Sequence, residues 1–172
     1  MWEIVGESGK ACIFALETEK RLSMIQLLGD YTCRIDGKGR LKLPADLLKQ
    51  LGEDRDKRFV LKQGADRCLV LYPEEVWEQK TTLVNQLNTL IKEEREYRRA
   101  FLRSARYVET DSSERINIPD NMLKYAEIER EVKVLALADE IEIWAVGLYE
   151  ESAEEDERIL REAPEKIWKK QP

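Results

Sequence analysis

Residues 36–44 read DGKGRLKLP, and residues 111–119 read DSSERINIP. The two stretches share an aspartate, an arginine four positions later and a proline four positions after that, at one constant offset of 75 (111 − 36). Short apolar strands can resemble one another by chance, but chance does not explain matching Asp, Arg and Pro in register. The chain therefore contains an internal duplication, and a repeat of this kind decides the fold.

The first half of each copy predicts a strand, a tight turn, a second strand and a short helix. In the first copy a strand over residues 30–35 enters a turn at Asp36-Gly37, because Gly accepts the positive φ of a reversal. Residues 40–43 then alternate polar and apolar, as in a half-buried strand. Pro44 suits the first turn of a helix, and Pro119 occupies the same place in the second copy.

The second half of each copy predicts two more strands. Apolar segments at 59–61 and 69–72 correspond to those at 132–134 and 141–144, now with an offset of 72 (144 − 72). The first copy therefore carries three extra residues, which we place in the charged loop from Glu53 to Lys57, where insertions are tolerated.

Helices are predicted between the copies and after the second one. Apolar residues at helical spacing indicate a helical stretch from Glu74 to about Ser104, in which Trp77, Tyr97 and Phe101 suit core packing or a subunit interface better than base stacking. A last, strongly acidic helix follows Trp144, and Pro164 should break or kink it.

Composition narrows the classes of function. The net charge is -6, so any DNA site must be a local basic patch on an acidic protein. There is no histidine, and the three cysteines form no C-x-x-C pair, so we expect no zinc site, no disulfide framework and no cofactor. No apolar run approaches the ~20 residues of a membrane span, and Met1 to Ser23 fails as a signal peptide. We expect a cytoplasmic protein.

The two arginines are the candidate DNA contacts. A guanidinium can bond a phosphate or the edge of a guanine bidentately, which suits Arg40 and Arg115. Lys38 and Lys42 would add phosphate contacts, and Arg34 makes the first copy locally more basic. Alternatively, each arginine pairs with the aspartate four residues before it and fixes the turn, and the two roles can coexist.

The remaining turn residues are interpreted as positioning groups. Asp36 and Asp111 suit turn formation better than acid–base catalysis, because Asp side chains accept bonds from neighbouring backbone N–H groups. Gly37 and Gly39 let the backbone approach a phosphate closely. The second turn has no glycine and places Glu114 directly before its arginine, which predicts that it binds DNA more weakly.

Other sequence features are compatible with functions besides DNA binding through the turns. The basic stretch from Arg95 to Arg106 could be a second DNA surface, but its interleaved glutamates favour a solvated helix with i,i+4 ion pairs. A small β-barrel enzyme would need a polar pocket that the sequence does not indicate.

A set of short motifs occurs along the chain in a recognisable order. They are Gly29-Asp30-Tyr31, then Asp36-x-Lys38-Gly39-Arg40-Leu41-x-Leu43-Pro44-Ala45, Cys68-Leu69-x-Leu71-Tyr72-Pro73-x-x-x-Trp77, the second Asp-x-x-x-Arg, and Glu142-Ile143-Trp144. With these motifs the chain resembles the MraZ family over roughly Met24 to Tyr149. Residues 1–23 have no counterpart in that pattern, and Glu114 stands where the family usually has Gly.

The resemblance implies an α+β fold of two tandem SpoVT/AbrB-like repeats, swapped-hairpin halves of one β-barrel, with short helices, a helical connector and a C-terminal helix. It places an N-terminal extension at 1–23, the first repeat at 24–77, the helical connector at 78–105, the second repeat at 106–149 and an acidic helical tail at 150–172.

It also implies a non-enzymatic, nucleoid-associated transcriptional regulator of the division and cell-wall gene cluster. Such a protein acts on repeated elements in promoter DNA as a homo-oligomeric ring of eight or more subunits. The alternative is an AbrB-like antitoxin or other protein-binding module that uses its C-terminal segment.

Overall fold

The computed structural model describes residues 26–52 and 58–168 of the chain. The expected N-terminal extension at 1–23 and the expected insertion within 53–57 lie outside the described residues. None of the helices in the described ranges is long and apolar enough to cross a membrane.

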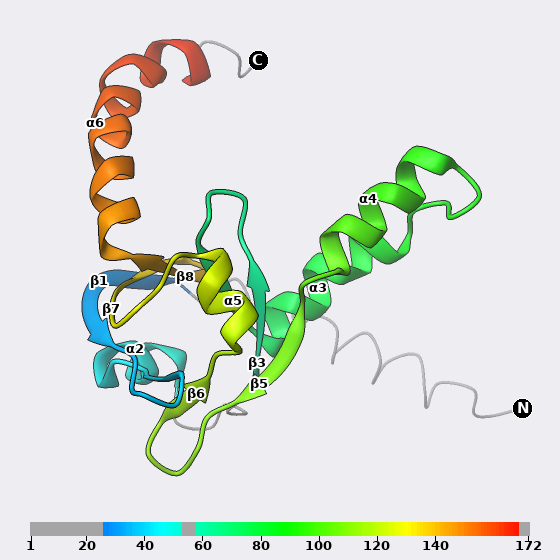
Figure 1. Cartoon of the computed structure of the whole chain (residues 1–172). Coiled ribbons are helices and arrows are strands. Elements are labelled where there is room, and N and C mark those ends of the chain that lie inside the picture. The colour runs from blue at the N-terminus through cyan, green and yellow to red at the C-terminus, as the bar shows by residue number, and fades with distance from the viewer. Residues whose placement is uncertain (1–25, 53–57, 169–172) are drawn as a thin grey trace, which may run out of the picture.

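The two copies contain the same elements in the same order, as the sequence predicts (Figure 1). The first copy consists of β1 (Leu27–Arg34), β2 (Arg40–Lys42), α2 (Ala45–Leu51), β3 (Arg58–Gln63) and β4 (Leu69–Pro73). The second consists of β5 (Arg106–Glu109), β6 (Arg115–Asn117), α5 (Asp120–Tyr125), β7 (Glu131–Ala138) and β8 (Glu140–Ala145). The mixed α+β class is confirmed.

Strands of the two copies pair with one another. The main sheet has the order β1-β7-β8-β4-β3-β5, with antiparallel neighbours throughout, so the first strand of each copy lies beside the third strand of the other. The second strands of the two copies, β2 and β6, form a separate two-stranded antiparallel ribbon. Neither copy can therefore complete its sheets without the other.

The core lies between the main sheet, the ribbon and the short helices. Every residue of β4 is buried, because this strand lies at the centre of the sheet beside β8. The apolar face of the ribbon covers one side of the core. Its side chains and those just after its strands are at most 1% exposed: Leu41, Leu43, Ile116 and Ile118. Burial of such side chains contributes about 1.5–3 kcal/mol each, which fixes the ribbon firmly on the domain.

The connector consists of two helices, whereas the sequence predicted one helical stretch. α3 (Glu74–Asn85) and α4 (Lys92–Leu102) run side by side as an arm that projects from the core (Figure 1). The break lies at Asn88, whose side-chain oxygen accepts a hydrogen bond from the backbone N–H of Leu90 at 3.0 Å, a local bond that competes with helix. At the base of the arm Trp77 is 5% exposed and stacks on Phe101, so the expected core packing is confirmed for these two rings.

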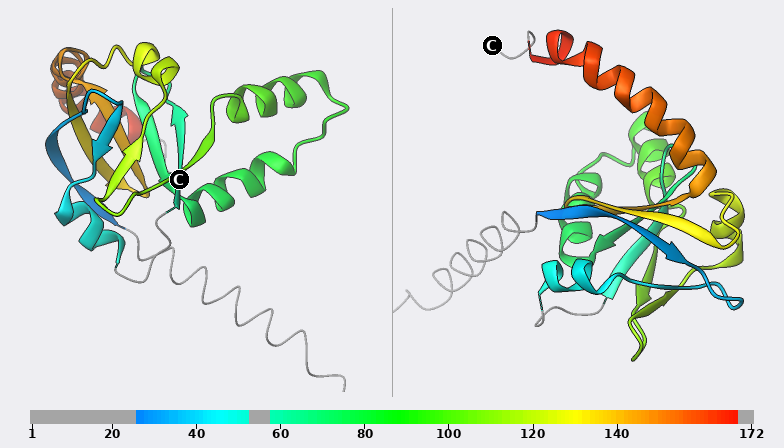
Figure 2. Two further views of the ribbon diagram at one scale, coloured as in Figure 1. Left: turned by 60° about the horizontal axis from the view of Figure 1, so that its bottom comes forward. Right: turned by 90° about the vertical axis from the view of Figure 1, so that its left-hand side faces the viewer.

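The predicted acidic helix is present as α6 (Val146–Trp168). It continues through Pro164, so the proline does not break it, but its last turns change direction, which agrees with the predicted kink (Figure 1). Two further views show that α6 and the α3/α4 arm leave the core on different sides (Figure 2).

Candidate nucleic-acid interface

The β2–β6 ribbon presents one apolar and one polar face. Its register pairs Arg40 with Asn117, Leu41 with Ile116, and Lys42 with Arg115. Cross-strand partners share a face, and side chains alternate along a strand, so the two apolar residues face the core while the other four face outward. The outward face therefore carries three cations and one amide on two adjacent strands.

In the first turn Asp36 organises the backbone. Its Oδ1 accepts hydrogen bonds from the backbone N–H groups of Lys38 at 2.9 Å and Arg40 at 3.0 Å. Its Oδ2 accepts one from Arg40 Nε at 2.8 Å and lies 2.7 Å from Arg40 Nη2. The Arg40 side chain and these backbone donors lower the pKa of Asp36 to about 2, because they stabilise the ionised carboxylate.

The second turn repeats this network. Asp111 Oδ1 accepts from the backbone N–H groups of Ser113 at 2.8 Å and Arg115 at 3.0 Å, and Oδ2 accepts from Arg115 Nε at 3.1 Å. The backbone N–H of Arg115 is the main cause that lowers the pKa of Asp111. The pairing of each arginine with the preceding aspartate, which the sequence left as an alternative role, is thus present in both turns.

The two turns interlock. The backbone N–H of Ile118 donates to the carbonyl of Gly39 at 2.9 Å, and the N–H of Leu43 donates to the carbonyl of Glu114 at 3.0 Å. In addition, Arg115 Nη1 lies 3.9 Å from Asp36 Oδ2, so the carboxylate of the first turn also attracts the arginine of the second. The turns and the ribbon therefore form one unit that holds both arginines at the same end of the molecule.

The position before each arginine has a left-handed backbone. Gly39 has a φ of 76° and Glu114 a φ of 60°. A Cβ at Gly39 would lie 2.9 Å from the carbonyl oxygen of Ile118, so glycine is required there by both conformation and space. Glu114 adopts the same region at a cost of about 1–2 kcal/mol.

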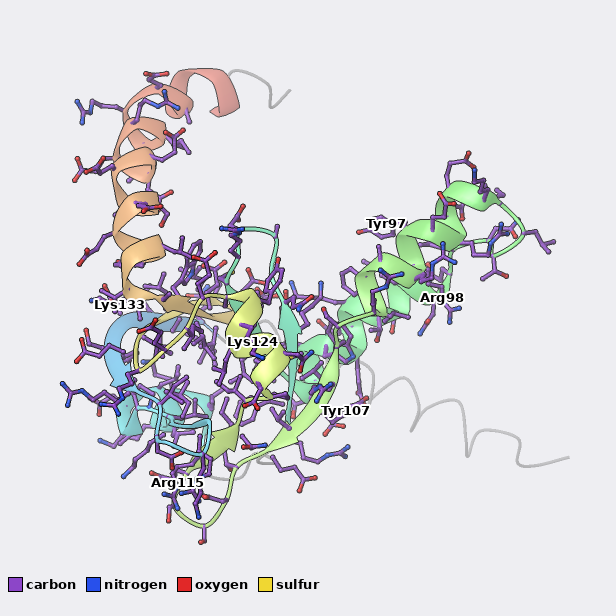
Figure 3. All side chains as sticks on the ribbon, viewed as in Figure 1. Tyr97, Arg98, Tyr107, Arg115, Lys124 and Lys133 are labelled. Carbon is purple, nitrogen blue, oxygen red and sulfur yellow. The ribbon has the colours of Figure 1, made fainter. Side chains whose placement is uncertain are left out.

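The other predicted residues surround the ribbon. Gly37 and Lys38 are exposed at the tip of the first turn, and Lys42 is exposed on the ribbon. Arg34 lies at the end of β1, where its guanidinium pairs with Glu131 at 2.7 Å while the side chain remains 80% exposed. Figure 3 shows Arg115 at the end of the molecule away from the arm that carries Arg98.

Two polar residues at this end were missed by the sequence analysis. Asn117 shares the outward face and corresponds to Lys42 in the repeat, so the offset of 75 could have identified it. Arg130 borders the same hollow as Gly37 and Lys38, and its carbonyl accepts a hydrogen bond from the N–H of Ile35 at 2.8 Å. No local pattern connects Arg130 with the first turn, because 90 residues separate them along the chain.

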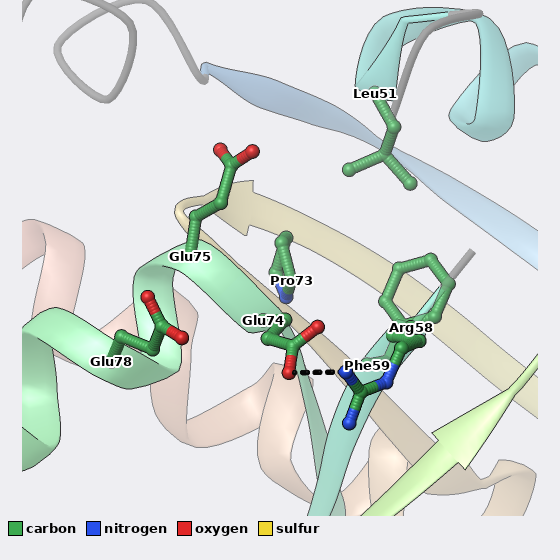
Figure 4. Close-up of a pocket in the computed structure, with 7 residues that line it drawn as sticks. All are labelled: Leu51, Arg58, Phe59, Pro73, Glu74, Glu75 and Glu78. Atoms are coloured by element: carbon green, nitrogen blue, oxygen red, sulfur yellow. Dashed lines mark ion pairs between the residues drawn. The ribbon is translucent and has the colours of Figure 1, made fainter. Parts of the chain in front are cut away.

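A small cavity lies away from the ribbon. It has a volume of about 170 Å³ and lies between β3, β4 and α3, lined by Leu51, Arg58, Phe59, Pro73, Glu74, Glu75 and Glu78 (Figure 4). Arg58 forms an ion pair with Glu74 at 3.1 Å inside it. Ligand sites usually enclose about 300 Å³ or more, and this cavity contains neither predicted turn, so it carries no argument for catalysis.

Metal binding finds no support in residues 26–52 and 58–168. These ranges hold no cluster of three or more His, Cys, Asp or Glu side chains that could bind a metal ion. In the described chain, the two thiols at Cys33 and Cys68 are free, and burial raises the pKa of the Cys68 thiol to about 12, so it stays protonated and unreactive.

Comparison with known proteins places the duplication in a family. The family model described as "MraZ protein, putative antitoxin-like" matches twice, at residues 26–100 and 101–170. A protein of Christiangramia forsetii named Transcriptional regulator MraZ is 34% identical over 145 residues, which cover 84% of this chain and 94% of that one. A protein of the same name from Halothermothrix orenii is 35% identical over 143 residues, which cover 81% of this chain and 97% of that one. Another from Flavobacterium psychrophilum is 33% identical over 133 residues, which cover 77% of this chain and 85% of that one. The chain belongs to the MraZ family.

Proposed function

We propose that this chain is a sequence-specific DNA-binding transcriptional regulator that uses the outward face of the β2–β6 ribbon. The observation that carries the proposal is the placement of Arg40, Lys42, Arg115 and Asn117 on the outward face of a two-stranded ribbon. Lys42 and Asn117 are exposed on this face, and the two arginines are half-buried. The major groove of B-DNA admits a two-stranded β-ribbon, and its base edges offer partners for arginine and asparagine. The names of the relatives agree with this role.

The fold and the family support a finer proposal. The strand exchange between copies supports a swapped-hairpin barrel built from repeats at 24–77 and 106–149. One ribbon offers few base contacts, so useful specificity needs several subunits on repeated elements. We infer a cytoplasmic, nucleoid-associated homo-oligomer, a ring of eight or more subunits, that regulates the division and cell-wall gene cluster.

The test is a titration of duplex DNA from the gene's own upstream region, followed by fluorescence anisotropy at several salt concentrations. We expect saturable binding that weakens with salt, with a slope of log K against log salt of about −0.9 for each phosphate contact. A scrambled duplex of the same composition is the control. Equal affinity for both duplexes would contradict sequence specificity, and no binding at low salt would overturn the proposal.

An antitoxin role rests on a different observation, the exposed helix α6 at the end of the second copy. Such a protein would bind a toxin through α6 and would bind DNA only secondarily. The DNA role is favoured because the Asp-x-x-x-Arg turn is duplicated, and both copies contribute a strand to one ribbon that is complete within the chain.

A further inference from the structure

The outer part of α6 has an apolar and acidic surface that residues 26–52 and 58–168 leave uncovered. Leu148 and Tyr149 pack against the core, and Ile159 and Leu160 follow them after 11 residues, which is three helical turns and therefore the same face. At this distance the face extends past the sheet, and Ile159 and Leu160 are 46% and 75% exposed. All side chains from Glu154 to Glu162 are exposed.

We call residues 150–163 of α6 the overhang, and this segment carries strong negative charge. It contains seven acidic and two basic side chains, a net charge of −5. Both basic side chains are already paired within the helix, Arg158 with Glu155 and Arg161 with Glu157. Helices in proteins gain most of their stability from tertiary packing, so a partner that covers the apolar and acidic surface of the overhang would stabilise it.

The α3/α4 arm has the complementary surface. A stripe of basic side chains runs along α4 to its C-cap, at spacings of three or four residues: Lys92, Arg95, Arg99 and Arg103. Arg99 lies about 200° around the helix from Phe101, which packs on Trp77, so the stripe faces away from the core. Residues 92–106 contain six basic and three acidic side chains, a net charge of +3.

The tip of the arm also exposes apolar side chains beside this stripe. Leu90 is 88% exposed and Ile91 is 43% exposed. The arm therefore offers the two features that complement the overhang, exposed apolar side chains for its Ile159 and Leu160 and positive charge for its carboxylates. The two surfaces cannot meet within one chain, because the arm and α6 leave the core on different sides (Figures 1 and 2).

We propose that the overhang of α6, residues 150–163, docks on the basic stripe of α4 in a second copy of this chain. The two surfaces differ, so the contact is head-to-tail, and each copy offers one of each. The contact lies at the opposite end from Arg115 and leaves the ribbon free (Figure 3). It deepens the oligomeric part of the proposed function by naming the surfaces that join the subunits.

The test is charge exchange, read as molar mass by light scattering at low ionic strength, where exposed charges interact most strongly. We expect the wild-type chain to form an assembly of several 20.2 kDa subunits. The arm variant Arg99→Glu/Arg103→Glu and the helix variant Glu154→Lys/Glu157→Lys should each fall to the monomer mass. The chain with all four substitutions should assemble again, because the attraction is restored with its signs reversed.

The matched control is Lys49→Glu/Lys124→Glu, which changes the net charge by the same amount as the arm variant on exposed sites of α2 and α5. Its mass should equal that of the wild type, and circular dichroism should show that all variants are folded. A monomeric wild type, an arm variant that stays assembled, or a fourfold variant that stays monomeric would overturn the proposed contact.

A DNA arm of the experiment separates this inference from the proposed function. Monomeric variants should still bind a duplex with one repeat element through the ribbon. If the arm variant stays assembled but loses this binding, α4 is a DNA surface and the docking proposal is wrong. If the charge exchange behaves as expected and no form binds DNA, the docking stands and the proposed function fails.

Discussion

The two turns of the molecule have one backbone network and opposite charge. Residues 36–40 contain two cations and one anion, a net charge of +1, whereas residues 111–115 contain one cation and two anions, a net charge of −1. Arg40 pairs with one carboxylate, that of Asp36, while Arg115 lies near both Asp111 and Asp36. Duplication has thus preserved the geometry of the turn more strictly than its electrostatic potential.

This difference matters because each turn has an observed role, holding its own backbone, and a proposed role, attracting phosphate. The two roles depend on different residues. The aspartates hold the backbone through identical hydrogen bonds, at 2.9 and 3.0 Å in the first turn and 2.8 and 3.0 Å in the second. Attraction of phosphate would depend instead on the charges around the arginine. Lys38 strengthens this attraction in the first turn, and Glu114 weakens it in the second. The first turn should therefore dominate DNA binding.

The largest expected effect separates the two arginines. Arg40→Ala should weaken binding to a single-repeat duplex by about 5- to 150-fold, since a bidentate base contact is worth about 1–3 kcal/mol of discrimination. Arg115→Ala should weaken it less, because that guanidinium is shared with two carboxylates. Fluorescence anisotropy titrations of the two variants measure the difference, and equal losses would show that both turns bind alike.

The next effect concerns backbone conformation. Gly39→Ala should destabilise the protein by at least about 1 kcal/mol, because an L-residue is disfavoured at a φ of 76° and its Cβ would meet the Ile118 carbonyl. The matched control is Gly37→Ala, since a Cβ there meets no atom within 4 Å. Thermal unfolding should show a lower midpoint for the first variant alone, and equal midpoints would contradict the steric argument.

A smaller effect should come from Glu114. Glu114→Gly relieves the left-handed strain, but the added freedom of glycine in the unfolded chain offsets most of this gain, so the free energy of unfolding should change little. DNA affinity should rise up to about fivefold, because an exposed charge interaction is worth about 0–1 kcal/mol. Glu114→Gln removes the charge without the backbone change and should give a similar rise. No gain from either variant would show that this charge does not oppose phosphate.

The smallest effect is visible only at low pH. Asp36 should titrate near pH 2, as followed by NMR of its carboxyl carbon. A folded pKa below the unfolded value stabilises the protein above about pH 4, and this contribution disappears as the pH falls toward 2. Arg40→Ala should raise the midpoint toward the ordinary value. An unchanged midpoint in that variant would mean that the arginine does not stabilise the carboxylate.

The sequence predicted the local structure of both copies well because the signals were local. The alternation after Asp36 and the proline at 44 define strand and helix within a few residues, and the repeat supplied the second set. The break in the connector was missed because Leu87, Leu90 and Ile91 keep helical spacing while the bond of Asn88 ends the pattern.

The pairing of strands could not be derived in the same way. β1 pairs with β7, more than 90 residues away, and no periodicity within either strand specifies its partner. For the same reason the sequence indicated the arginines but not that Arg40 lies opposite Asn117 on one face. Asn117 carries no charge, so the pattern of basic residues does not include it, although it corresponds to Lys42 in the repeat.

The central claim is that the outward face of the ribbon binds DNA. It is tested most directly with the ribbon variant Arg40→Ala/Arg115→Ala on a duplex with one repeat element at low salt. The comparison is a second arm variant, Arg99→Ala/Arg103→Ala, which removes the two charges of the arm without reversing them. We expect the ribbon variant to lose specific binding while circular dichroism shows an intact fold, and the second arm variant to retain the affinity of the wild-type chain. A folded ribbon variant that binds the duplex as tightly as the wild type would contradict the claim.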